Sequence, residues 1–219
     1  TLTQSGTLSV SCWFYTDDAS TQMSFFGAGT TNPYQIRNFG LNGGEYVVVV
    51  YTKNLTPNLR GIGHTTTAGS VAYPIGQWTH FVGIIEKVTS TNANYYLYEN
   101  GVLKVQTNDG YREQTTYPFF LGRMNNFGTA TQKFNGKISN VTIFDYPLSS
   151  AQISSLYNSG SPINPMTLKP APIAYYPLGG NASTGGDSTN TLSVPNVAIP
   201  DASVFDFDGS NDFIDLGTT

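Results

Sequence analysis

The chain has 219 residues, a formal net charge of −4 and only 11 % charged residues. It has no Lys/Arg cluster of the kind that binds nucleic acid or anionic lipid surfaces, and no stretch approaches the ~18 apolar residues of a membrane span. The N-terminus lacks the basic and apolar pattern of a secretory signal, so we expect any such signal to have been removed or to lie in a longer precursor. A chain of this length can form one large all-β domain.

The first predicted element is a strand in the run TLSVSCWFY, where apolar and polar side chains alternate. This period of two indicates one buried face, which would carry Leu8, Val10, Cys12 and Phe14. Cys12 is the only cysteine, so no disulfide holds the fold together. We expect Cys12 to be a small buried core residue and not a nucleophile.

The middle of the chain contains further runs with a period of two, separated by Gly, Asn, Pro and Thr clusters. These runs include SFFGAG, EYVVVVY, NYYLYENG, YPFFLG and KISNVTIFDY, and together they predict an all-β fold. Asn100-Gly101 lies between two alternating segments. Because both residues tolerate a positive φ, this dipeptide predicts a hairpin with a type I′ turn.

The run WTHFVGIIE is apolar in both registers, so its buried face stays open. One register would bury Trp78, His80, Val82 and Ile84, and the other would bury their neighbours. The two histidines, His64 and His80, lack the spacing of metal ligands. We therefore expect His80 to be a strand residue with its hydrogen bonds satisfied.

One convincing helix signal follows, in YPLSSAQISSLYNSG near residues 149–158. Ser149 or Ser150 can cap its N-terminus, and ISSLY supplies apolar residues at helical spacing. Gly160 is expected to end the helix.

The proline-rich segment SPINPMTLKPAP predicts an extended connector at residues 162–172. It separates a main body, residues 1–161, from a C-terminal part, residues 173–219.

Four separated segments together resemble the LamG-like, concanavalin A-like jelly-roll family. They are PIAYYPLGG with FDFDGSNDFIDLG, GTLSVSCWFYT, QWTHFVGIIEK with YYLYENGVLK, and FNGKISNVTIFDYPLSSAQISSLYNSG. The resemblance covers nearly the whole chain. It implies an all-β, two-sheet antiparallel jelly-roll β-sandwich with one concave sheet and with rim loops that contact ligands or partners in some members.

The order of these segments differs from that of the family. The pattern in residues 173–217 normally opens such a domain, and here it comes last. Residues 173–219 are therefore expected either to complete their own domain, as in a circular permutant, or to complete the next copy in a head-to-tail array. In this respect the chain resembles one out-of-phase repeat of a tandem LamG surface or virion protein.

Candidate ligand contacts are the tyrosines, because sugar rings pack their apolar faces on aromatic side chains. Those considered are Tyr34, Tyr51, Tyr73, Tyr111 and Tyr117. Catalysis is not expected, because the closely spaced Glu-x-Asp-x-x-Glu acids of sandwich glucanases are absent.

Calcium is the one cofactor that the sequence indicates. Oxygen donors gather at Asp206, Asp208, Asn211 and Asp212, and Ca²⁺ takes such ligands. Asp17-Asp18 would lie at a neighbouring strand end. We favour over calcium a tight turn in which the Asp side chains bond the local backbone, so no cofactor is expected and calcium is the alternative.

These features favour a non-enzymatic structural or adhesive module of an extracellular or virion-surface repeat protein, such as a fibre, decoration protein or capsid-associated protein. Its partners would be neighbouring copies of the module or other surface or virion proteins. The alternative is a carbohydrate-binding, lectin-like module with a glycan partner. Nucleic-acid binding and membrane insertion are not expected.

Overall fold

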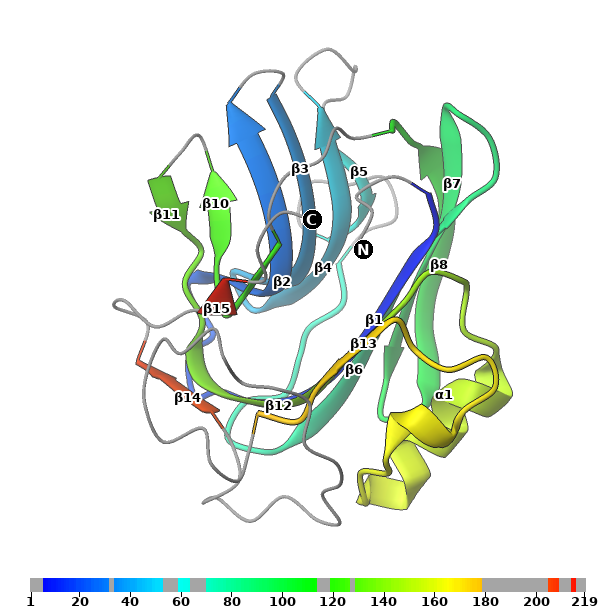
Figure 1. Cartoon of the computed structure of the whole chain (residues 1–219). Helices are drawn as coiled ribbons and strands as arrows, with labels where there is room; N and C mark the ends of the chain where they lie inside the picture. The colour runs from blue at the N-terminus through cyan, green and yellow to red at the C-terminus, as the bar shows by residue number, and fades with distance from the viewer. Residues whose placement is uncertain are drawn as a thin grey trace.

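The computed structural model describes residues 6–31, 34–52, 59–63, 70–113, 119–126, 129–178, 205–208 and 214–215. In these ranges two antiparallel sheets pack face to face, and a short helix lies outside them (Figure 1). The expected two-sheet antiparallel jelly-roll β-sandwich is confirmed. Within the described part, the chain has no helix that is both long and apolar enough to cross a membrane.

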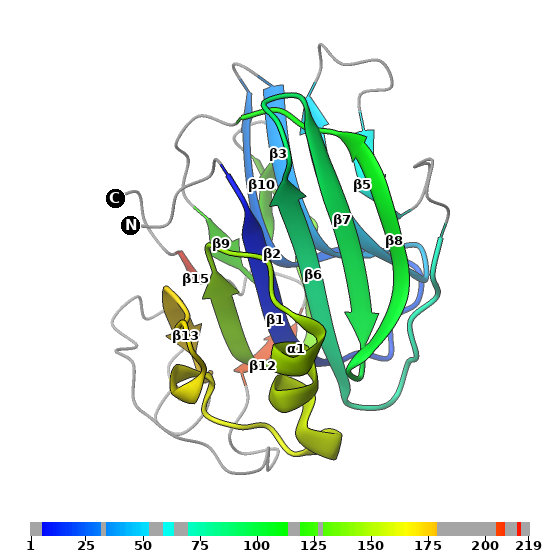
Figure 2. The same ribbon diagram turned by 90° about the vertical axis from the view of Figure 1, so that its right-hand side faces the viewer.

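The larger sheet contains β1 (Leu8–Tyr15), β6 (Thr79–Lys87), β7 (Asn92–Glu99), β8 (Val102–Gly110), β12 (Asn135–Phe144), β13 (Ala174–Tyr176) and β14 (Phe205–Asp208). Its order is β13-β12-β1-β6-β7-β8, and β14 also pairs with β12 (Figure 2). β1 is therefore a central strand, although its two neighbours come from much later in the chain.

The smaller sheet contains β2 (Gln22–Thr31), β3 (Tyr34–Asn42), β4 (Glu45–Thr52), β5 (Leu59–Ile62), β9 (Phe120–Leu121) and β15 (Ile214–Asp215). Its order is β15-β9-β2-β3-β4-β5. A two-stranded arm lies beside β2 and consists of β10 (Met124–Asn126) and β11 (Thr129–Thr131).

The main core lies between the two sheets and includes the predicted face of β1. Leu8, Val10, Cys12 and Phe14 are all buried there, as the alternation predicts. Burial raises the pKa of the Cys12 thiol, because the charged thiolate would lose its hydration. The side chain is thus kept neutral, in agreement with a core residue.

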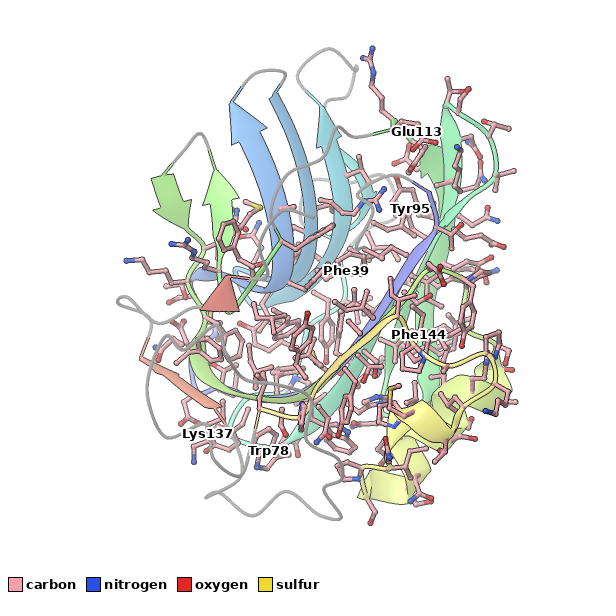
Figure 3. All side chains as sticks on the ribbon, viewed as in Figure 1. Phe39, Trp78, Tyr95, Glu113, Lys137 and Phe144 are labelled. Carbon is pink, nitrogen blue, oxygen red and sulfur yellow. The ribbon has the colours of Figure 1, made fainter. Side chains whose placement is uncertain are left out.

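Both faces of β6 are buried, which explains why the sequence alone could not show which face of this strand points between the sheets. Phe81 and Ile85 belong to the main core, whereas Val82 and Ile84 belong to a second cluster under the helix α1 (Ser150–Tyr157). The register that would place His80, Val82 and Ile84 between the sheets is wrong, and the neighbouring register is right. Figure 3 shows the two layers, with Phe39 between the sheets and Phe144 toward α1.

The helix begins at the expected cap. Ser149 Oγ accepts a hydrogen bond from the Gln152 backbone N–H at 3.3 Å, and Gln152 Oε1 accepts one from the Ser149 backbone N–H at 2.9 Å. This reciprocal pair is a capping box. The helix ends at Asn158 in the left-handed conformation, two residues before the expected Gly160. Short 3₁₀ turns follow at Asn158–Gly160 and Pro165–Thr167.

The predicted hairpin joins β7 to β8. Asn100 and Gly101 have φ of 50° and 78°, so both take the positive φ that a type I′ turn requires. Asn100 Oδ1 also accepts a hydrogen bond from the backbone N–H of His80 at 2.9 Å. The turn is thereby tied to the neighbouring strand.

His80 lies on the outer face of β6, beneath α1. Its Nε2 is hydrogen bonded to Ser11 Oγ at 2.8 Å, but Nδ1 has no partner among the described residues. The expectation that its hydrogen bonds are satisfied is therefore met at only one ring nitrogen. Its ring centroid lies 5.1 Å from that of Trp13 and 6.0 Å from that of Tyr157. Burial lowers the pKa of His80 to about 3, because the charged ring would lose its hydration.

This depressed pKa predicts a loss of stability in mild acid. Above pH 6.5 His80 is neutral in both the folded and the unfolded chain. Between pH 6.5 and about 3 only the unfolded chain binds a proton at His80. The free energy of unfolding therefore falls as the pH falls through this range. Each pH unit in that window lowers the free energy of unfolding by up to about 1.4 kcal/mol. Urea unfolding between pH 6.5 and 5 should show this slope, and H80F should reduce it. An equal slope in H80F would contradict the assignment.

Candidate functional site

A hollow of about 400 Å³ opens where β1 ends and β12 begins. It is lined by Tyr15, Asp17, Asp18, Asn135, Gly136 and Lys137. The two lining segments are far apart in the sequence, and the antiparallel pairing of β1 with β12, in which Tyr15 lies opposite Lys137, brings them together. We call this site the β1–β12 hollow.

An aromatic pair stands beside the β1–β12 hollow. The ring centroids of Tyr15 and Trp78 are 6.1 Å apart, and both side chains are half-buried. Lys137 Nζ lies 5.7 Å from the centroid of the Tyr15 ring, and Figure 3 shows Lys137 and Trp78 at the same end of the sandwich. The loop that carries Trp78 is held by a 2.9 Å hydrogen bond from the Gly76 N–H to the Thr16 carbonyl.

The carboxylate of Asp18 is hydrogen bonded to residues of its own turn. Its carboxylate accepts hydrogen bonds from the backbone and side chain of Ser20, at 2.8 and 3.0 Å, and from those of Thr21, at 3.2 and 2.7 Å. Partial burial raises the pKa of Asp18, but the bonds from Thr21 and Ser20 outweigh this effect and lower the pKa to about 2. The neighbouring Asp17 is exposed and accepts a 3.3 Å hydrogen bond from Tyr15 Oη.

The β1–β12 hollow therefore combines an apolar surface with several kinds of polar group. Tyr15 in its lining and Trp78 beside it offer aromatic carbon. The polar groups of the lining include the exposed amide of Asn135, the carboxylate of Asp17 and the ammonium group of Lys137. Sugar-binding sites use this combination, because C–H faces pack on aromatic rings while hydroxyls bond to amides and carboxylates. The chemistry of the site suits a neutral sugar.

The predicted tyrosines lie elsewhere. Tyr73 and Tyr111 are buried, with 7 % and 1 % exposure, and Tyr73 Oη donates a 2.8 Å hydrogen bond to the Asp18 carbonyl. Tyr34 begins β3 and Tyr51 lies in β4; their side chains, and all of Tyr117, fall outside the described part of the structure. Among the described residues that line the β1–β12 hollow, none comes from the predicted set.

The backbone of two predicted calcium ligands, Asp206 and Asp208, lies at the same end of the sandwich. In β14, Asp206 pairs with Lys137 and Asp208 pairs with Asn135, so this strand borders the β1–β12 hollow. The side chains of both aspartates lie outside the description, as do the two remaining predicted ligands, Asn211 and Asp212. The described residues contain no group of three or more His, Cys, Asp or Glu side chains that could hold a metal. Calcium binding stays a prediction.

Sequence reasoning missed the Tyr15–Trp78 pair. Phe14 pairs with Thr79 in the antiparallel contact between β1 and β6, so the residues just beyond them, Tyr15 and Trp78, meet at the rim. The available signal was their position, since each aromatic residue stands where an alternating run meets a turn. That signal becomes specific only when the strand register is known.

Comparison with known proteins identifies the family to which this fold belongs. A family model described as the concanavalin A-like lectin/glucanases superfamily, Laminin_G_3, matches residues 1–154. The chain belongs to this superfamily. Its predicted LamG-like membership is thus confirmed, and no match was found among curated proteins.

Two solved structures illustrate the shared concanavalin A-like fold. Domain 4 of AbnA, a GH43 extracellular arabinanase from Geobacillus stearothermophilus solved in complex with arabinotriose, has a TM-score of 0.51 and 21 % identity over 71 % of this chain and 68 % of that chain. The "putative carbohydrate binding protein" of Bacteroides ovatus ATCC 8483 has a TM-score of 0.56 and 14 % identity. The match covers all of this chain but only 54 % of that protein. At these identities the likeness concerns the fold alone.

Proposed function

We propose that the protein is a non-catalytic carbohydrate-binding module that acts outside the cell and holds its ligand at the β1–β12 hollow. The observation that carries the proposal is the half-buried Tyr15–Trp78 pair beside a hollow with amide and carboxylate groups. The superfamily includes lectins by its description, and the fold of AbnA domain 4, solved with arabinotriose, supports the same class of ligand.

The proposed ligand is a neutral oligosaccharide. One sugar ring would pack on Trp78 and Tyr15, and its hydroxyls would bond to Asn135 and Asp17. A non-catalytic role is supported by the state of Asp18, whose carboxylate is ionised and engaged by four hydrogen bonds. Glycoside hydrolysis instead needs one carboxyl group that donates a proton and a second group across the bond.

Removing the Trp78 ring should weaken sugar binding. We expect W78A to lower the affinity by at least about fivefold, because a stacked aromatic contact contributes on the order of 1 kcal/mol beyond its buried area. Calorimetry on the full chain would test this, with arabinotriose as the first ligand and an oligosaccharide array to find better ones. The matched control is Y98A, because Tyr98 is a half-exposed aromatic of β7 in the cluster next to α1. Equal affinity in W78A and Y98A, or no binding by the unaltered chain, would contradict the proposal.

A second candidate is a structural or adhesive module of an extracellular or virion-surface protein whose copies assemble. The observation in its favour is that the edge of β12 is covered by β13 and β14, which come from the C-terminal part. The same strands can cover β12 of a neighbouring copy if they are exchanged. Glycan binding and assembly would then be separate properties of one module.

The mass of the protein in solution distinguishes two arrangements of the C-terminal strands: exchange between copies, and completion of the domain within one chain. We propose that residues 173–219 complete their own domain, because β13, β14 and β15 all pair with strands of the same chain. Light scattering after size-exclusion chromatography should therefore give the mass of one chain across a wide concentration range. Dimers or polymers that grow with concentration would instead favour exchange between copies.

A further inference from the structure

A buried arginine lies between the sheets. Arg37 in β3 is opposite Ala28 in β2 and Val50 in β4, and both of these residues belong to the main core. Directly opposed residues share one face of a sheet, so the Arg37 side chain points inward. Its exposed fraction is 0 %.

The guanidinium group of Arg37 is only partly hydrogen bonded. Its Nη2 lies 3.1 Å from Tyr111 Oη and 3.4 Å from the Gly6 carbonyl oxygen. Nε and Nη1 are also buried, and no acceptor for either lies among the residues that the structure describes. The guanidinium group of an arginine carries a positive charge, so the unpaired donors belong to a buried cation.

The charges around Arg37 do not balance. Glu113 Oε2 accepts hydrogen bonds from Tyr111 Oη at 3.0 Å and from the Gly6 N–H at 3.1 Å. Its other oxygen, Oε1, forms an ion pair with Lys87 Nζ. Glu113 is thus paired directly with Lys87 and is linked to Arg37 only through Tyr111. The cluster of Arg37, Lys87 and Glu113 has one positive charge in excess.

The same cluster leads from the interior to the surface. The side chains of Lys87 and Glu113 are 35 % and 38 % exposed, whereas Tyr111 and Arg37 are buried. Figure 3 shows Glu113 at the end of the sandwich opposite Lys137 and Trp78. This cluster is therefore separate from the β1–β12 hollow.

We propose that the cluster binds a small monovalent anion, such as chloride, at Nε and Nη1 of Arg37. An anion supplies acceptors for donors that the described residues leave unpaired, and it offsets a buried charge that is otherwise costly. The ligand is small because the guanidinium is fully buried, which excludes a sugar carboxylate. The hydrogen bond from Arg37 Nη2 to Tyr111 Oη joins β3 of one sheet to the end of β8 in the other, and the anion would lie on the other side of the same guanidinium.

Chloride-dependent unfolding of the full chain tests this site. An anion that binds only the folded state raises the folding equilibrium constant by the factor 1 + [L]/Kd. At fixed ionic strength, replacing sodium gluconate with sodium chloride should therefore raise the folding equilibrium constant. The rise should be about tenfold for each tenfold increase in chloride concentration above Kd. R37M should lose the dependence. K104M removes a surface cation paired with Glu99 and should keep it.

A second measurement needs no variant. Crystals of the unaltered chain grown with sodium bromide should give an anomalous peak within hydrogen-bonding distance of Arg37 Nε or Nη1. No peak there, an equal response to gluconate and chloride, or a chloride response retained in R37M would each overturn the proposal. Ordered water would then be the partner of these donors.

Discussion

Replacing Phe25 with alanine should lower the free energy of unfolding by about 3 to 5 kcal/mol. Phe25 in β2 is fully buried, and its ring centroid lies 4.7 Å from Phe14, 5.1 Å from Phe81 and 5.3 Å from Phe134. Phe14 and Phe81 belong to the larger sheet, so one side chain joins the two layers. A domain has only about 5 to 15 kcal/mol of stability in total, and the loss would take a large share of it.

Urea unfolding followed by circular dichroism would measure this effect. V102A is a suitable control, because Val102 in β8 is 63 % exposed and a surface change usually alters stability by less than about 0.5 kcal/mol. F25L keeps most of the buried volume and should fall between the two variants. If F25A were as stable as V102A, the packing of Phe25 against Phe14, Phe81 and Phe134 described above would be wrong.

Replacing Phe207 with alanine should be nearly as damaging, by about 3 to 5 kcal/mol. Phe207 in β14 is fully buried in the main core, and its ring makes an edge contact with Phe134 at 6.3 Å. It packs over Gly122, where an added methyl group would overlap the Phe207 ring. Such a loss is expected if the C-terminal strands complete a core, and in a chain that light scattering shows to be a monomer this core is its own.

A double-mutant cycle with Gly122 separates packing from other effects. G122A alone should destabilise the chain, because Gly122 has a φ of +72° and its methyl group would meet the Phe207 ring. In the double variant the ring is gone, so part of that cost should disappear, with a coupling of about 0.5 to 3 kcal/mol. Additive losses would mean that the two residues do not touch in solution. A negligible loss in F207A would reject the closure of the domain by its own C-terminal part.

Local signals in the sequence predicted the local structure well. The alternation in TLSVSCWFY identified the buried face of β1, Asn100-Gly101 identified a type I′ hairpin, and Ser149 identified the helix start. Each of these features depends on a few neighbouring residues, whose backbone preferences or spacing are enough to select one conformation. The family resemblance added the sandwich and its two sheets.

Features that depend on pairing between distant segments could not be predicted in the same way. The alternation in β6 could not reveal its core face, because α1 buries the other face as well. Tyr15 and Trp78 become a pair only through the register of β1 with β6. Arg37 has the same phase as the core residues Phe39 and Leu41, but an arginine in such a run gives no sign of being fully buried. The candidate site and the proposed anion site both depend on such tertiary contacts.

The position of β1 has a consequence for how the chain folds. Leu8 pairs with Ile85 in β6, and Ser9 pairs with Phe144 in β12. This central strand therefore cannot form its sheet pairing until β6 and β12 have been synthesised. Contacts between residues so far apart in sequence carry a high loop-closure entropy, and proteins dominated by them fold roughly in milliseconds to seconds. During synthesis the apolar face of β1 therefore emerges long before its cover, which makes early aggregation the main hazard for this topology.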